Sequence, residues 1–194
     1  FESRGLGDVY KRQDEGIIKG MYLLRGAPKG DGPLVRLIGS GPIMVQVLDA
    51  VEKLETYGVR CEIYSATSYG ELRREGLACD RHNRLHPTDE VRRPYVETLL
   101  AEPLPTVAVS DNMAAVPDMI RQWVSGPYTV LGTDGFGRSD TREALRRFFE
   151  IDGAAIALAA LSSLVREGEL DAKVYAKAEK NFAVSTERDD IASL

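Results

Sequence analysis

The segment LGTDGFGRSDTRE follows the apolar run at residues 128–131 and gathers side chains that could bind an anion. Its candidate residues are Asp134, Gly135, Gly137, Arg138, Ser139 and Asp140. Ligands of open α/β proteins bind where strands end, and free N–H groups at a helix N-terminus attract anions. Two hypotheses therefore compete. The segment is either an anion site centred on Arg138, which the flanking acids could neutralise, or a structural turn that brings strand, helix and a partner surface together.

Cys79, His82 and His86 form the cluster whose Cys-x2-His-x3-His spacing is most typical of metal ligands. Structural zinc sites usually need four ligands, and this pattern offers three. We therefore expect no metal here. The alternative is a polar loop in which both histidines bond to backbone or to a neighbouring domain.

Of two other catalytic or binding motifs, one is incomplete and one is absent from the sequence. The turn GSGPIM at residues 39–44 resembles a phosphate-binding turn, but it lacks the third glycine of G-x-G-x-x-G and the Lys of a P-loop. We interpret it as a tight turn between a strand and a helix. The nucleophile motif G-x-S-x-G does not occur in the sequence, so it gives no sign of a serine hydrolase.

Length, charge and cysteine content restrict the class of protein. A chain of 194 residues is long enough for one well-buried domain and short for two. The net charge of -5 argues against a nucleic-acid partner. Cys61 and Cys79 are too few for a disulfide framework, which fits a cytoplasmic location. The most apolar run, residues 154–165, falls short of the roughly 20 residues that span a bilayer, so we expect no membrane anchor.

The elements that would position these residues alternate along the chain. We expect strands at residues 16–24, 33–41, 59–66, 105–110 and 128–131, the first two joined as an antiparallel hairpin. Apolar spacing predicts a helix from Pro42 to Gly58. Further helices are expected at residues 89–100, 111–124, 153–167 and 172–182. One more is expected after Asp140, with Leu145, Phe148 and Phe149 on its apolar side.

Capping residues predict where several helices begin. Ser68 with Glu71 forms a capping box for a short helix, which gives way to an irregular polar connection at residues 78–87. Asp140 with Glu143 forms a second such pair. The expected N-caps of three more helices are Asp111, Asp152 and Asp171.

Strands that alternate with helices at short intervals predict an α/β fold. We expect a mostly parallel open sheet with one antiparallel edge strand and helices on both faces. Residues 1–13 resemble translated sequencing-adapter sequence and are left out of the fold. We assign residues 14–32 to a linker and edge strand, 33–184 to the domain, and 185–194 to a mobile tail.

Several of these stretches together resemble a known family. The loop LGTDGFGRSDTREALRRFFEID, with GIIKGMYLL, LIGSG, YSATSYGELRREG and RLHP, looks like the C-terminal domain of homodimeric, bacterial-type pyruvate dehydrogenases. The resemblance covers residues 14–184 and implies the fold of a transketolase C-terminal domain. The corresponding loop of transketolase itself does not read GTDGFGRSD, so that family ranks second. A stand-alone anion- or partner-binding module remains the alternative of a different class.

The resemblance implies a role in a larger enzyme. Members decarboxylate pyruvate on thiamin diphosphate and reductively acetylate a lipoyl group on an acyltransferase. The diphosphate and Mg2+ sit on one upstream domain, and the activating Glu comes from another. No catalytic, cofactor or metal residue is therefore expected in this chain. The implied partners are the upstream domains, a second subunit and the acyltransferase. This role favours the structural hypothesis, in which Gly132, Gly135 and Gly137 let the backbone pass close to a helix.

Overall fold

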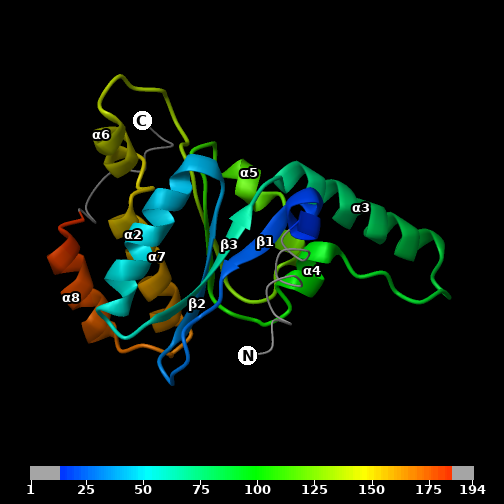
Figure 1. The fold of residues 1–194 in the computed structure, drawn as a ribbon, viewed down its shortest axis with the longest axis horizontal. Coiled ribbons are helices and arrows are strands. Elements are labelled where there is room, and N and C mark those ends of the chain that lie inside the picture. Colours follow the sequence, from blue (N-terminus) through cyan, green and yellow to red (C-terminus); the bar gives the residue numbers. More distant parts are fainter. Residues whose placement is uncertain (1–13, 185–194) are drawn as a thin grey trace, which may run out of the picture.

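The computed structural model describes residues 14–184, which form a five-stranded sheet between two helical layers (Figure 1). The strands are β1 (Met21–Arg25), β2 (Leu34–Gly39), β3 (Arg60–Ala66), β4 (Thr106–Val109) and β5 (Tyr128–Leu131). Their order across the sheet is β1-β3-β2-β4-β5. β1 is antiparallel to β3, and all other neighbours are parallel. The predicted fold class is confirmed.

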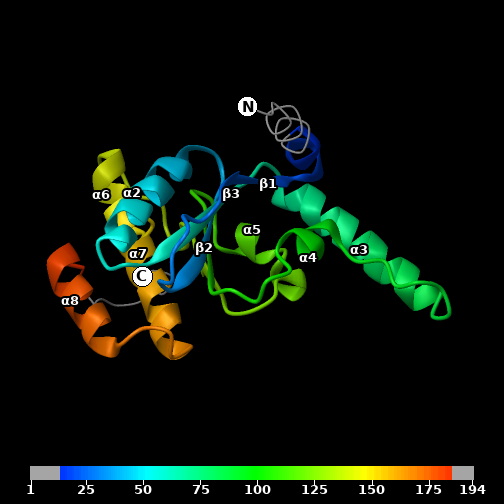
Figure 2. The same cartoon turned by 60° about the horizontal axis from the view of Figure 1, so that its bottom comes forward.

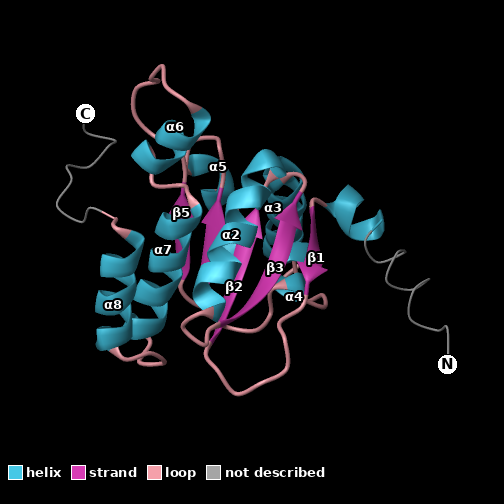
Figure 3. Cartoon of the chain, turned by 60° about the vertical axis from the view of Figure 1, so that its left-hand side comes forward, coloured by secondary structure: helices cyan, strands magenta, loops and turns pink. Residues whose placement is uncertain are grey.

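Helices cover both faces of the sheet, as Figures 2 and 3 show. One layer contains α2 (Met44–Glu55), α7 (Gly153–Arg166) and α8 (Ala172–Phe182), with α6 (Arg142–Phe148) above it. The other layer contains α3 (Tyr69–Leu85), α4 (Tyr95–Leu99) and α5 (Ala115–Asp118). Two 3-10 turns, η1 (Gly41–Ile43) and η2 (Arg121–Trp123), lie between these elements.

The two layers have separate cores because side chains alternate across each strand. On β2, Leu37 packs toward α2 and α7, and its neighbour Ile38 packs toward α3 and α4. Both side chains are fully buried. β4 repeats the pattern with Val107 on the first face and Ala108 on the second. The described residues therefore have an apolar core of their own on each side of the sheet.

The range Arg142–Arg166 has the length and apolar composition of a membrane span. It is weak evidence for one, because the same test is passed by core helices, and 56% of its apolar window is buried. The structure also breaks the range between α6 and α7, where residues 149–152 leave the helix. Within α7 the buried side chains include Ile156, Leu161 and Leu164, which pack against the sheet.

The predicted hairpin is wrong. β1 pairs with β3, and β2 lies on the other side of β3. Residues 14–19 are helical, so the strand begins at Met21 and not at residue 16. Gly20, with φ +103°, makes the turn between them. The long connection at residues 26–33 lets the chain pass over β3 before β2 begins, and a parallel β2–β3 pair then forms through the crossover helix α2.

Two predicted segments on the other face also differ. α3 continues to Leu85 through residues expected to be irregular, and it is anchored by Asp80, which accepts a hydrogen bond from the Trp123 indole at 3.2 Å. The helix expected at residues 89–100 begins only at Tyr95. Proline disfavours helical backbone in the residue before it, so Pro94 delays the start and becomes the N-cap.

Three of the predicted helix caps are confirmed and two are wrong. Ser68, Asp152 and Asp171 accept hydrogen bonds from the backbone N–H groups of Glu71, Ala155 and Lys173, respectively, as predicted. Two predicted caps are wrong. Thr141 caps α6 by accepting from the Ala144 N–H, whereas Asp140 accepts from the Thr141 N–H just outside the helix. Asp111 lies four residues before α5, whose N-cap is Ala114.

Candidate functional site

The first half of the glycine-rich loop, residues 131–134, is hydrogen-bonded to the loop that follows β4. Beyond the end of the β4–β5 pair, the Thr133 N–H donates to the Asn112 carbonyl at 2.9 Å. The Asp134 carboxylate accepts from the Ala114 N–H at 3.2 and 3.3 Å. A Cβ on Gly132 would lie 2.3 Å from the Ala114 nitrogen, so only glycine fits there. The prediction of a close backbone approach is confirmed at this position.

The second half of the loop, residues 135–140, is exposed. Phe136 has 82% of its surface exposed, and Gly135 adopts φ +92°, which favours glycine. Gly137 is different: no heavy atom lies within 4 Å of a Cβ built there, and its φ is not in the left-handed region. The expectation that Gly137 permits a close approach is therefore wrong. The chain passes that point in open space.

The polar residues of this half satisfy one another or solvent. The Arg138 guanidinium lies over the Phe148 ring of α6, 4.1 Å from its centroid. Neither flanking acid forms an ion pair with it among the described residues: Asp134 accepts a hydrogen bond from the Ala114 N–H, and Asp140 accepts one from the Thr141 N–H. Ser139 is exposed. The helix that follows is only seven residues long, so its N-terminus is a weak anion site.

The cysteine and histidine cluster lies on the distal half of α3. His82 and His86 stack with ring centroids 4.6 Å apart, and both approach the Asp89 carboxylate, at 4.0 and 3.9 Å. The Cys79 thiol instead donates to Glu75 at 3.2 Å, and burial raises its pKa to about 11. Within residues 14–184, no group of three or more Cys, His, Asp or Glu side chains could hold a metal ion.

The turn at residues 39–44 is tightly packed against the helix that follows it. A Cβ on Gly39 would lie 2.9 Å from Val47 and 3.0 Å from Met44, and Gly41 adopts φ +65°. Close packing therefore accounts for Gly39, and the positive φ accounts for Gly41. It supports the interpretation of a tight strand-to-helix turn.

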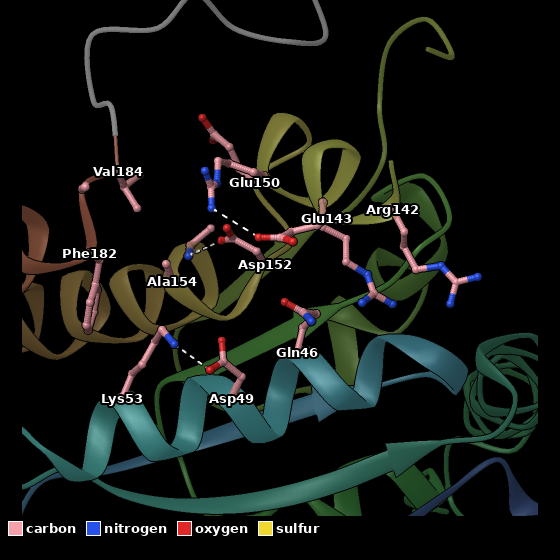
Figure 4. A pocket seen from close by; sticks show the side chains of 14 residues that line it. Gln46, Asp49, Lys53, Arg142, Glu143, Glu150, Asp152, Ala154, Phe182 and Val184 are labelled. Atoms are coloured by element: carbon pink, nitrogen blue, oxygen red, sulfur yellow. Dashed lines mark hydrogen bonds and ion pairs between the residues drawn. The ribbon is translucent and has the colours of Figure 1, made fainter. Parts of the chain in front are cut away.

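A cleft of about 780 Å³ lies between α2, α6 and the N-terminus of α7, and sequence reasoning missed it (Figure 4). Its walls carry Gln46, Asp49 and Lys53 from α2 and Arg142 and Arg146 from α6. The end of the described chain, residues 182–184, closes one side. The available signal was the spacing of the two arginines, four residues apart on one side of a helix. That both arginines line one cleft follows only from the packing of α6 over α2 and α7, which the sequence does not show.

The sequence matches the model of the transketolase-like TK C-terminal domain over residues 20–152. The chain belongs to this family. The match begins just before β1 and ends just before α7, so it includes all five strands and the glycine-rich loop.

The pyruvate dehydrogenase E1 components of three bacteria are similar in sequence over nearly the whole chain. Identity is 45% for *Pseudomonas aeruginosa* and 42% for *Mycolicibacterium smegmatis*, each over 92% of this chain. It is 47% over 87% of this chain for *Corynebacterium glutamicum*. The matched region is 18 to 20% of these relatives, so the chain spans about a fifth of their length.

Solved transketolases share the fold at much lower identity. The enzyme from *Pichia stipitis* superimposes with a TM-score of 0.52 over 81% of this chain and 20% of its own. The enzyme from *Leishmania mexicana* gives 0.51 over 78% of this chain and 19% of its own. Both are 19% identical to this sequence. This likeness concerns the fold alone.

The family resemblance drawn from the sequence implies thiamin diphosphate and Mg2+ in the larger enzyme, so the described residues must be compared with what those groups require. No metal-ligand group is present in residues 14–184, and in the turn at residues 39–44 Gly39 serves packing and Gly41 a positive φ. The described residues do not fit the cofactor. No step of cofactor chemistry is therefore assigned to this chain.

Proposed function

We propose that this chain is the C-terminal domain of a pyruvate dehydrogenase E1 component. The observation that carries the proposal is identity of 42 to 47% to such proteins over about nine tenths of the chain. Transketolases of the same fold are only 19% identical. The contrast favours pyruvate dehydrogenase over transketolase, the second-ranked family. A stand-alone module is disfavoured because every one of these relatives extends far beyond the matched region.

The parent enzyme would be a cytoplasmic homodimer. It would decarboxylate pyruvate on thiamin diphosphate and Mg2+ bound by upstream domains, and would reductively acetylate the lipoyl group of an acyltransferase. The chain described here would brace the dimer and the catalytic domains. The exposed tip of the glycine-rich loop, with Phe136, offers a contact surface for such domains.

The test compares the isolated chain with its parent. The 194-residue chain should give no pyruvate-dependent turnover with thiamin diphosphate and Mg2+ added, and the chain extended by the upstream reading frame should regain it. Pyruvate decarboxylation and lipoyl acetylation are measured separately. Turnover by the isolated chain would contradict the supporting role. A parent that transfers ketol units between sugar phosphates and leaves pyruvate unchanged would point to transketolase.

A further inference from the structure

The helix at residues 14–19 turns its isoleucines away from the domain. Ile17 has 47% and Ile18 has 77% of its surface exposed, and neither belongs to the two apolar cores. The side that faces the domain is formed by the buried Gly16, where a Cβ would lie 2.7 Å from the Tyr22 Cβ of β1. Figure 3 shows this helix beyond the outer edge of β1. Its two large apolar side chains therefore point away from both cores.

This helix is nevertheless held in one position. The Ile17 carbonyl accepts a hydrogen bond from the Thr67 hydroxyl at 2.8 Å, and the Gly20 carbonyl accepts one from the Thr67 N–H at 2.9 Å. The Lys19 ammonium lies over the Tyr95 ring, 5.0 Å from its centroid. An isolated helix of so few residues is unstable in water, so its contacts with the domain hold it. The exposed isoleucines are thus presented by a fixed element.

The strand that follows adds to the exposed apolar surface. β1 lies at the edge of the sheet, with β3 on its inner side, and its Leu23 and Leu24 side chains are exposed. Twelve large apolar side chains are exposed among the described residues, and four of them lie within residues 17–24. Single exposed apolar residues are normal, whereas such a concentration marks a contact surface. We call Ile17, Ile18, Leu23 and Leu24 the β1-edge surface.

The position of this surface indicates what covers it. The matched region is 18 to 20% of the pyruvate dehydrogenase relatives, and in the proposed parent the upstream domains join this chain ahead of residue 14. A domain attached there is held at a high effective concentration beside the surface, which favours it over a second copy or a separate protein. All four side chains are aliphatic, so the contact gains stability by removing apolar area from water. The partner must therefore offer an apolar patch.

We propose that the β1-edge surface binds an apolar patch on the domain immediately upstream of this chain in the same polypeptide. The inference rests on the proposed function, which supplies that domain, and it adds the place where the two domains meet. The contact also covers the outer side of β1, an open strand edge that could otherwise pair with other chains. Gly16 and Gly20 then serve the interface, because they let the helix lie close enough to the domain to present its isoleucines outward.

The first experiment compares amide hydrogen exchange in the isolated 194-residue chain and in the parent chain supplied by the upstream reading frame. Amides of residues 17–24 should exchange about 10-fold or more slowly in the parent, because the covering domain opposes local opening. Equal exchange in the two chains overturns the proposal. The isolated chain is also measured at several concentrations. Protection of residues 17–24 that rises with concentration to the level of the parent overturns it too, because the occupant would then be a second copy.

The second experiment substitutes the surface in the parent. Ile17→Ser with Ile18→Ser should make the amides of residues 21–24 exchange about 10-fold faster than in the unsubstituted parent, because two buried apolar side chains are lost from the contact. The matched control is Leu85→Ser with Val91→Ser, whose side chains are 51% and 69% exposed beside the distal end of α3. It should leave exchange at residues 21–24 unchanged. No effect of the isoleucine substitutions, or an equal effect of the control, overturns the proposal.

Two further measurements separate this inference from other causes. In the isolated chain, both double variants should melt at the temperature of the unsubstituted chain, because all four substituted side chains are exposed there. A lower melting temperature for the isoleucine variant alone would mean that these side chains already serve this domain, which contradicts the proposal. A parent that turns over pyruvate but shows equal exchange refutes the inference alone. A parent with transketolase activity and protected residues 17–24 refutes the proposed function alone.

Discussion

The two halves of the glycine-rich loop differ in how they are held. Residues 131–134 bond to the loop after β4, and Gly132 lies against the Ala114 backbone. Residues 135–140 are exposed and are held by one contact between Arg138 and Phe148 and by the bond from Thr141 to Asp140. The first half therefore serves the fold. The second half adds little to the fold, which leaves its side chains available to another surface.

This difference changes the question that the loop raises. An anion site and a structural turn were alternatives for one segment, yet they concern separate residues. The structural role belongs to Gly132 and Asp134, which meet buried or partly buried backbone. Any recognition role belongs to Phe136, Arg138 and Ser139 at the tip. Substitutions along the loop should therefore fall from large to small effects on stability as they approach the tip.

The largest effect is expected for Gly132→Val. Its side chain would overlap the Ala114 nitrogen and Cα, which lie 2.3 and 2.7 Å from a Cβ at this position. Backbone cannot move aside as a flexible side chain can, so we expect a loss of about 3 kcal/mol or more in unfolding free energy. Urea denaturation measures it. Gly137→Val, which meets open space, is the matched control and should cost under about 1 kcal/mol.

An intermediate effect is expected for Asp134→Ala. The substitution leaves the Ala114 N–H without its acceptor at the start of α5, and a bond from a neutral donor to a carboxylate contributes about 1.5 to 3 kcal/mol. Partial exposure lowers the expected loss to about 1 kcal/mol. Asp134→Asn keeps an acceptor oxygen and should recover most of the loss. If the two variants unfold at the same denaturant concentration, the bond does not hold the loop.

Gly135→Ala tests the boundary between the halves. Its φ of +92° is one that glycine adopts readily and alanine does not. We expect a loss of about 1 kcal/mol, from backbone strain alone, because the residue is exposed. The substitution should also leave the Thr133 bond to Asn112 intact, which hydrogen exchange of that amide can verify. Faster exchange there would mean that the two halves are coupled.

Hydrophobic periodicity and capping predicted much of this fold correctly. The strands at β2, β3, β4 and β5 were short apolar runs between turn residues, and Asp152 and Asp171 stood immediately before amphipathic helices. Such signals are local, so the sequence carries them directly. Strand order is not local. The β1–β2 hairpin was wrong because pairing with β3 depends on a contact some 40 residues further along the chain.

The candidate site shows the same limit. Sequence placed Gly132, Gly135 and Gly137 together because all three are glycines in one loop, yet Gly132 meets another backbone and Gly137 meets nothing within 4 Å. Which glycine lies against Ala114 depends on how the loop after β4 packs beside the loop after β5. The cleft was missed for the same reason, because its walls come from helices about 100 residues apart in the chain. The family resemblance predicted the correct family because it compares long segments of sequence at once.

The smallest effect on stability is expected for Arg138→Ala, and this variant decides what the tip does. Its guanidinium lies over Phe148, and an exposed cation–π contact contributes about 0.5 to 1 kcal/mol. We expect a change of that size in unfolding free energy, and no dependence of the melting temperature on added phosphate in either form. If phosphate raises the melting temperature of the unsubstituted chain and not of Arg138→Ala, the tip is an anion site.

In the parent enzyme, the same substitution should weaken dimerisation or activity only if Arg138 touches a neighbouring domain, because its contribution to this fold is too small to act through stability. Phe148→Leu provides the control, since it removes the ring beneath Arg138 and keeps the charge. Equal loss of parent activity in both variants would assign the effect to the position of Arg138, whereas loss in Arg138→Ala alone would assign it to the charge.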